Sequence, residues 1–243
     1  MVDLHIHILP GLDDGARSWD ETLEMAEMAA ESGVTALAAT IHANLPYQKQ
    51  EDRERLFTYR EQLRYFRQLL EQEKIPLTVY SGMEIFVQGN NFVEKIKKGT
   101  LLTLNHTPYV LIEFPMDVAA AGIYRAVFSL LDAHLIPVLA HPERYDCVCR
   151  VPDHVYEWFK LGAVIQMNKG SILGRFGPAV METAYFLLQN NLVSVVASDA
   201  HRPYTRTPDM TEVCDVLSSR YGRERAVRLL SENPRRILLQ KFF

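Results

Sequence analysis

Apolar and polar positions follow two patterns along the chain, and each pattern predicts one kind of element. Short, nearly continuous apolar runs are typical of buried strands, and longer segments with an apolar residue every three or four positions are typical of helices. Strands are predicted at 2–8, 34–40, 77–85, 109–114, 136–140, 163–167 and 192–197. Helices are predicted at 18–33, 52–73, a short segment from 92, 118–134, 153–161 and 178–190, and in the C-terminal part, with breaks at Gly222 and Pro234.

Strands that alternate with helices in this way form a parallel sheet whose faces the helices cover. We expect an α/β fold in which the sheet closes into a distorted (β/α)7 barrel of the TIM type, with an open doubly wound sheet as the alternative. At 243 residues and 48% hydrophobic composition, the chain can bury a sizeable core. Because no change of composition marks a linker, a single domain over residues 1–243 is predicted.

Acidic and imidazole side chains recur at or just past the carboxyl ends of the predicted strands. On the first strand, Asp3, His5 and His7 share one face because side chains alternate along a strand. Active sites of barrels lie at this end of the strands, which favours the barrel over the open sheet. The candidate metal ligands are His5, His7, Asp14, His42, Glu84, Glu113, His141, Asp199 and His201.

Nine nitrogen and oxygen ligands exceed what one metal ion takes, and no thiolate is among them. Such a set suits two or three divalent ions, with manganese, iron and zinc as the candidates. Asp13 competes with Asp14 for the loop ligand, and spacing does not choose between them. Asp3 lies deeper on its strand, where it is expected to support an imidazole. The remaining histidines, His106, His134 and His154, do not follow strands and are assigned to structure or surface.

Charge and composition exclude several classes of partner. With 26 Lys and Arg against 30 Asp and Glu, the net charge of −4 favours neither nucleic acid nor an anionic membrane. We expect no signal peptide, no membrane insertion and, from three cysteines without zinc-site spacing, a cytoplasmic location. Five arginines line the polar face of the helix at 52–73, either as a solvated face or as a docking face for an acidic peptide. Oligomeric state stays open.

Several motifs together resemble a known family. They are the opening Asp3, His5 and His7, the loop Gly11-Leu12-Asp13-Asp14-Gly15, the segments His141-Pro142-Glu143-Arg144 and Ser198-Asp199-Ala200-His201, residues 109–115, and the glycines and Phe176 within 170–177. They are similar to the polymerase and histidinol phosphatase (PHP) superfamily, and more narrowly to its bacterial protein tyrosine phosphatases of capsular polysaccharide biosynthesis. The resemblance covers nearly the whole chain and implies the PHP fold.

The resemblance also implies how the residues act. It suggests a manganese-dependent site in which His5, His7, Glu84 and Asp199 share one metal, Glu84, Glu113 and His141 a second, and Asp14, His42 and His201 a third. Glu84 would be the bridging carboxylate. It further implies that Arg144 and Arg206, placed just beyond His141 and His201, hold the phosphate. One departure concerns Ile41 and Ala43, which replace the common family residues beside His42.

Charge balance points to the same chemistry. Three divalent ions and four ligand carboxylates leave a surplus of two positive charges, which suits a phosphate dianion and a metal-bridging hydroxide that attacks phosphorus. The leading expectation is a metal-dependent protein tyrosine phosphatase whose substrate is a phosphotyrosine-containing bacterial tyrosine kinase that regulates capsule or exopolysaccharide synthesis. The alternatives are a small-molecule phosphatase of the histidinol-phosphate type and a non-catalytic PHP binding module.

Overall fold

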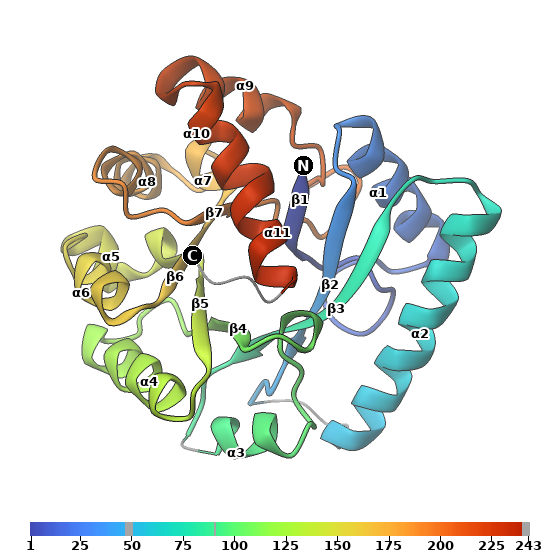
Figure 1. The fold of residues 1–243 in the computed structure, drawn as a ribbon, viewed down its shortest axis with the longest axis horizontal. Helices are drawn as coiled ribbons and strands as arrows, with labels where there is room; N and C mark the ends of the chain where they lie inside the picture. The colour runs from blue at the N-terminus through green and yellow to red at the C-terminus, as the bar shows by residue number, and fades with distance from the viewer. Residues whose placement is uncertain (47–50, 90, 240–243) are drawn as a thin grey trace.

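Seven parallel strands form one sheet that curls into a barrel (Figure 1). The computed structural model describes residues 1–46, 51–89 and 91–239. Neighbouring strands pair in sequence order, and a bridge between Ile6 and Ala200 brings the last strand back to the first. This arrangement confirms the expected (β/α)7 barrel. The strands are β1 (Val2–Ile6), β2 (Ala36–Ala43), β3 (Thr78–Phe86), β4 (Tyr109–Glu113), β5 (Ile136–Ala140), β6 (Val164–Asn168) and β7 (Val195–Ala197).

Helices surround the barrel, and α11 lies across one end of it (Figure 1). Ser18 begins the first helix as predicted, since its Oγ accepts a hydrogen bond from the Glu21 backbone N–H at 3.2 Å. The helices are α1 (Trp19–Glu31), α2 (Asp52–Gln72), α3 (Phe92–Lys97), α4 (Ala120–Asp132), α5 (Asp146–Arg150), α6 (His154–Leu161), α7 (Lys169–Ile172), α8 (Pro178–Gln189), α9 (Thr211–Tyr221), α10 (Arg223–Val227) and α11 (Asn233–Leu238), with 3-10 turns at Leu104–His106 and Pro142–Arg144 and a π-helical segment at Arg228–Glu232.

Some boundaries differ from those that the pattern predicts. Strand β2 continues to Ala43, which pairs with Ile85 of β3, so His42 lies within the strand and not after it. Strand β7 begins only at Val195, because the backbone N–H of Leu192 still bonds to Leu187 at the end of α8. The segment between the predicted strand at 163–167 and the predicted helix at 178–190 contains the short helix α7.

The barrel interior changes from apolar to polar along the strands. On β4, Tyr109 and Leu111 belong to an apolar cluster that Ile237 and Leu238 of α11 close at the amino-terminal end. Two residues further along β4, Glu113 faces the same interior at the carboxyl-terminal end. The alternation of the strands therefore places an apolar plug below and a polar rim above.

Part of the charge on the arginine-rich face of α2 has a structural explanation. Arg55 donates to the carbonyl oxygen of His42 at 2.7 Å, and Arg67 donates to that of Val79 at 3.0 and 2.7 Å. Arg64 pairs with Glu61 at 2.9 Å. The contacts of Arg55 and Arg67 join the helix to β2 and β3, whereas Arg64 and Glu61 pair on the exposed helix surface, so these contacts favour a structural or solvated face over a docking face. None of the helices in the described part of the chain is long and apolar enough to cross a bilayer.

Candidate metal centre

All nine predicted ligands meet at the carboxyl-terminal rim of the barrel. Strands β1 to β4 carry His5, His42, Glu84 and Glu113, and loops after β1, β5 and β7 carry the others. Seven of the nine side chains are buried, whereas His42 and Asp14 are 18% and 65% exposed. The side chains form four overlapping groups whose ligand atoms lie within 4.8 Å of one another: His7, Asp14, His42 and His201; His5, Glu84 and His141; His5, His7 and Asp199; and His42, Glu84 and Glu113.

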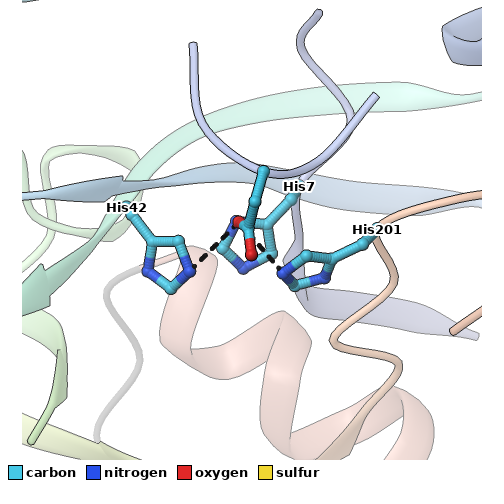
Figure 2. A group of neighbouring side chains, drawn as sticks. His7, His42 and His201 are labelled. Atoms are coloured by element: carbon cyan, nitrogen blue, oxygen red, sulfur yellow. Dashed lines mark ion pairs between the residues drawn. The ribbon is translucent and has the colours of Figure 1, made fainter. Parts of the chain in front are cut away.

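Asp14 binds between two imidazoles at the open side of the rim. Figure 2 shows His7, His42 and His201 turned toward one another. Asp14 Oδ1 lies 3.4 Å from His42 Nε2 and 3.4 Å from His201 Nε2. This is the third metal group that the resemblance implies, with His7 added to it.

Glu84 and Glu113 connect the neighbouring groups. Glu84 belongs to two of the groups, as a bridging carboxylate requires, and its Oε1 lies 3.2 Å from His5 Nε2 and 3.1 Å from His141 Nε2. Glu113 lies 2.8 Å from His42 Nδ1 but 3.9 Å from His141 Nε2. In this geometry Glu113 is thus nearer to His42 than to the expected partner His141.

Asp13 and Asp14 have different roles. Asp13 Oδ2 accepts hydrogen bonds from His7 Nδ1 at 2.7 Å and from the His42 backbone N–H at 2.9 Å, while its Oδ1 accepts from Gly15 N–H at 2.9 Å. Both oxygens are therefore engaged within the protein. A Cβ at Gly15 would lie 2.2 Å from the carbonyl oxygen of His7, so this tight turn requires glycine. The geometry favours Asp14 as the ligand and Asp13 as the support of His7.

A chain of side-chain amides fixes the orientation of His5. The Asp199 carboxylate only accepts hydrogen bonds when ionised, so the amide nitrogen of Asn168 must face it. Asn168 Oδ1 then accepts from Gln166 Nε2 at 2.9 Å, which leaves Gln166 Oε1 to accept from His5 Nδ1 at 2.9 Å. The proton of His5 is consequently on Nδ1, and its Nε2 lone pair is directed at the ligand cluster.

Gln166 and Asn168 are functional residues that the sequence interpretation missed. They alternate on β6, but the predicted strand at 163–167 includes only Gln166, and Asn168 falls just after it; neither side chain titrates or ligates metal strongly. The sequence feature that could have identified them is a pair of side-chain amides, two residues apart, at the carboxyl end of a strand. Asp3, in contrast, does not hold an imidazole as expected. Its Oδ1 accepts from the backbone N–H groups of His5 and Ser198, at 3.3 and 3.0 Å, because a register shift interrupts the alternation of β1.

The charges at the rim stabilise one another. Burial alone would raise the pKa of Glu84, but the imidazoles of His5 and His42 hold it well below its usual value. Burial likewise opposes protonation of His5, yet Glu84 and Asp199 raise its pKa. His201 differs, since burial and the neighbouring His7 lower its pKa to about 4. Protons on some imidazoles therefore balance the buried carboxylates, and divalent cations would displace them.

Several buried polar atoms at the rim make no hydrogen bond, which also fits a site for metal ions. Within the described residues, the buried atoms His42 Nδ1, Glu84 Oε2 and His201 Nε2 make no hydrogen bond, although carboxylate oxygens of Glu113 and Asp14 lie 2.8 Å from His42 Nδ1 and 3.4 Å from His201 Nε2. Glu84 Oε2 and His42 Nδ1 lie only 2.9 Å apart, but not in hydrogen-bonding geometry. Buried polar atoms without partners are costly, and coordination to a cation removes that cost. The donor set, all imidazole and carboxylate, suits divalent ions of the manganese, iron and zinc kind.

Both predicted arginines reach this rim through Asp199. Arg206 pairs with Asp199 Oδ2, and Arg144 Nη1 lies 3.4 Å from the same oxygen. The guanidinium of Arg144 also stacks on the ring of Phe176, 4.5 Å from its centroid. The other oxygen, Asp199 Oδ1, lies 3.5 Å from His5 Nε2 and 3.6 Å from His7 Nε2. Asp199 thus has one oxygen toward the imidazoles and one toward the arginines.

Comparison with known proteins identifies the family. The family model for capsular polysaccharide synthesis proteins, CpsB/CapC, matches residues 1–239. The chain belongs to the CpsB/CapC family. It is 36% identical to the tyrosine-protein phosphatase YwqE of Bacillus subtilis, over 98% of this chain and 91% of the relative. It is 29% identical to the tyrosine-protein phosphatase CpsB of Streptococcus pneumoniae, over 99% of both chains.

Solved structures agree with this assignment of a CpsB/CapC protein. A chain from the crystal structures of YwqE from Bacillus subtilis and CpsB from Streptococcus pneumoniae, described as unique metal-dependent tyrosine phosphatases, superposes with a TM-score of 0.91. It is 35% identical, and the match covers 100% of this chain and 96% of that one. A lactonase from Listeria monocytogenes, 11% identical, superposes with a TM-score of 0.62 over 98% of this chain and 94% of its own, which shows the shared barrel alone.

Proposed function

We propose that this chain is a metal-dependent protein tyrosine phosphatase. One observation carries the proposal: nine imidazole and carboxylate ligands converge at one rim, and two arginines meet them at Asp199. A phosphate monoester presents a dianion, and such a rim provides both cations and guanidinium donors to receive it. The names of the relatives add the substrate class, since YwqE and CpsB are tyrosine-protein phosphatases.

The ligand residues would hold two or three divalent ions, with manganese as the proposed native metal. The ligands are His5, His7, Asp14, His42, Glu84, Glu113, His141, Asp199 and His201, with Glu84 bridging. Bound cations of this kind supply Lewis acidity toward phosphate oxygens and lower the pKa of water. The protein contributes the fixed geometry: Gln166 and Asp13 hold the Nδ1 protons of His5 and His7, so that both Nε2 atoms are presented to the same cluster.

Arg144 and Arg206 are proposed to bind the phosphate group. Each guanidinium offers a planar pair of donors that matches two phosphate oxygens. The ring of Phe176 limits the motion of Arg144, and contacts with Asp199 place both guanidinium groups at the edge of the ligand cluster. A phosphotyrosine whose phosphate lies at this edge leaves as a phenolate, whose conjugate acid has a pKa of about 10, so the departure needs little help from a general acid.

The proposed physiological substrate is a phosphotyrosine-containing bacterial tyrosine kinase that regulates capsule or exopolysaccharide synthesis. The family assignment to capsular polysaccharide synthesis supports this partner. We further propose that the enzyme acts in the cytoplasm and that residues 1–243 form one functional domain. A hydrophobic cluster that extends from Ile6 on β1 to Leu230 near the C-terminal helices supports the single domain.

The test compares substrates and metals. Protein purified with chelator should be inactive, and added Mn²⁺ should restore hydrolysis of a phosphotyrosine peptide with a higher kcat/KM than that for histidinol phosphate. The reverse preference would identify a small-molecule phosphatase, and no metal-restored hydrolysis of either compound would favour a binding module. His5→Ala and Glu84→Ala should lose most activity together with bound metal. Unchanged metal content and rate in these variants would overturn the ligand assignment.

A further inference from the structure

An open apolar groove of about 600 Å³ lies on the outside of the barrel beside the metal centre. Its floor includes Val87 after β3, Phe92 of α3 and Phe114 after β4, and residues of α4 form its other wall. Helices α3 and α4 are neighbours around the barrel (Figure 1). The volume falls within the range of sites that bind small ligands or the side chains of peptides.

The groove and the metal centre share one strand end. Glu113 faces the rim, and the next residue, Phe114, lines the groove, because neighbouring side chains on a strand point to opposite faces. Val87 lies beside this strand end, since its backbone N–H donates to the carbonyl oxygen of Glu113 at 2.9 Å. Extended peptide covers up to about 3.3–3.6 Å per residue, so a residue a few positions from a phosphotyrosine at the rim can reach the groove.

Large apolar side chains stay exposed along this groove. Tyr124 and Phe128, one helical turn apart on α4, are 46% and 58% exposed, and both line it. Aromatic side chains grouped beside a pocket are typical of surfaces that bind another chain. A small phosphate ester held at the metal centre has no group that could cover them, whereas a polypeptide substrate does.

Arg125 gives the groove a charge preference. Its side chain lies in the lining, between the two exposed rings in sequence. Where the structure describes both partners, no ion pair includes Arg125. A guanidinium beside apolar walls pairs best with a carboxylate supplied by the bound chain.

We propose that this groove binds the segment that flanks phosphotyrosine in the protein substrate, with an apolar side chain against Val87, Phe92 and Phe114 and a carboxylate at Arg125. This inference rests on the proposed protein tyrosine phosphatase activity and adds its sequence preference. Selection of substrate then lies in a surface separate from the metal ligands, so binding of the flanking segment and hydrolysis of phosphate can be altered independently.

The test uses the full-length Mn²⁺-loaded enzyme and three substrates. One phosphotyrosine peptide carries leucine and glutamate within four residues on both sides, a second carries serine and lysine at those positions, and p-nitrophenyl phosphate has no flanking chain. The wild-type enzyme should prefer the leucine and glutamate peptide by about tenfold in kcat/KM, the effect of one good contact. Phe128→Ser and Tyr124→Ser should reduce that preference. Arg125→Glu should reverse the part of this preference that depends on charge, so that kcat/KM rises for the lysine peptide relative to the glutamate peptide.

Hydrolysis of p-nitrophenyl phosphate by these variants should stay at the wild-type rate, which also shows that they are folded and metal-loaded. Tyr156→Ser is the matched aromatic control, because Tyr156 on α6 is also 46% exposed but lies outside the groove. Arg60→Glu on α2 is the charge control. Equal kcat/KM for both peptides in the wild type, or an unchanged preference in the groove variants, would overturn the proposal. If the wild type hydrolyses p-nitrophenyl phosphate but neither peptide, the proposed protein phosphatase activity fails, and the groove proposal fails with it.

Discussion

Gln166 Oε1 lies 2.9 Å from His5 Nδ1 and holds that imidazole from a strand that supplies none of the nine candidate ligands. The amide can do so because its own nitrogen is engaged by Asn168, whose amide in turn binds Asp199. Asp199 after β7 and His5 on β1, both on the β7 side of β6, are thus connected through buried hydrogen bonds. Gln166 is a positioning residue in this arrangement, and its effect should appear in metal binding before it appears in phosphate binding.

Gln166→Leu should weaken metal binding by about 10- to 100-fold, the range that substitutions of hydrogen-bond partners of metal ligands usually produce. The measurement is bound Mn²⁺ at equilibrium over a range of free Mn²⁺ concentrations. Gln68→Leu, at an exposed position of α2, is the control and should bind metal like the wild type. Wild-type metal affinity in Gln166→Leu would show that the amide chain does not orient His5.

Asp13→Asn should destabilise the metal-free protein more than Asp14→Asn does. Asp13 accepts three N–H groups, from His7, His42 and Gly15, and an amide with a single oxygen cannot accept all of them. Loss of such a buried contact costs about 1–3 kcal/mol. Urea unfolding in the presence of chelator measures the difference.

Asp14→Asn should instead lower the number of bound metal ions, because the 65% exposed Asp14 side chain has its contacts at the ligand cluster. If Asp14→Asn lost stability but kept its full metal content, Asp14 would be the supporting residue and Asp13 the metal ligand. The two variants therefore distinguish a residue that supports a ligand from a residue that binds metal, at adjacent positions of one loop.

The fold and the convergence of the candidate ligands could be predicted because both rest on local periodicity. Each strand is an apolar run, and most candidate ligands lie near the carboxyl end of such a run, so parallel pairing brings His5, Glu84 and His141 together. The boundary of β2 could not be predicted, because its continuation through His42 depends on pairing with β3. The local pattern of apolar and polar residues carries no information about that long-range contact.

The supporting residues needed three-dimensional information. Asp13 and Asp14 are adjacent and chemically identical, and only the turn at Gly15 decides which carboxylate lies beneath His7. Gln166 and Asn168 become recognisable once β6 is placed beside β7, whose end carries Asp199 and which neighbours β1 with His5. Asp3 shows the reverse case, since the register shift in β1 removes it from the face that regular alternation predicts.

Arg206→Ala should preserve bound metal and lower kcat/KM for a phosphotyrosine peptide by about 100-fold or more, since it removes a charged donor from the proposed phosphate site. Inorganic phosphate should also inhibit this variant less strongly than the wild type. Arg175→Ala is the matched control, because Arg175 pairs with Glu212 at the surface. A parallel loss of metal and activity in Arg206→Ala would mean that the arginine supports the ligands and does not bind phosphate.

Lys169 should make the stability of the protein depend on pH above neutrality. Its ammonium group is buried, and it donates to the carbonyl oxygen of Asp209 and lies 3.5 Å from Thr207 Oγ1, in the loop after Arg206. Burial lowers the pKa of Lys169 to about 8 from its usual 10.5. Between these two values the unfolded chain binds more protons than the folded one, so the free energy of unfolding rises with pH through this window.

From pH 7.5 to 9.5 this contribution amounts to about 2 kcal/mol, by the relation of 1.36 kcal/mol per pKa unit. Urea unfolding at pH 7.5, 8.5 and 9.5 should show the rise as a growing difference between the wild type and Lys169→Met, whose side chain does not titrate. Lys160→Met, on α6, should track the wild type at all three values. A constant difference between Lys169→Met and the wild type would show that the Lys169 ammonium group titrates at the same pH in the folded and unfolded chains.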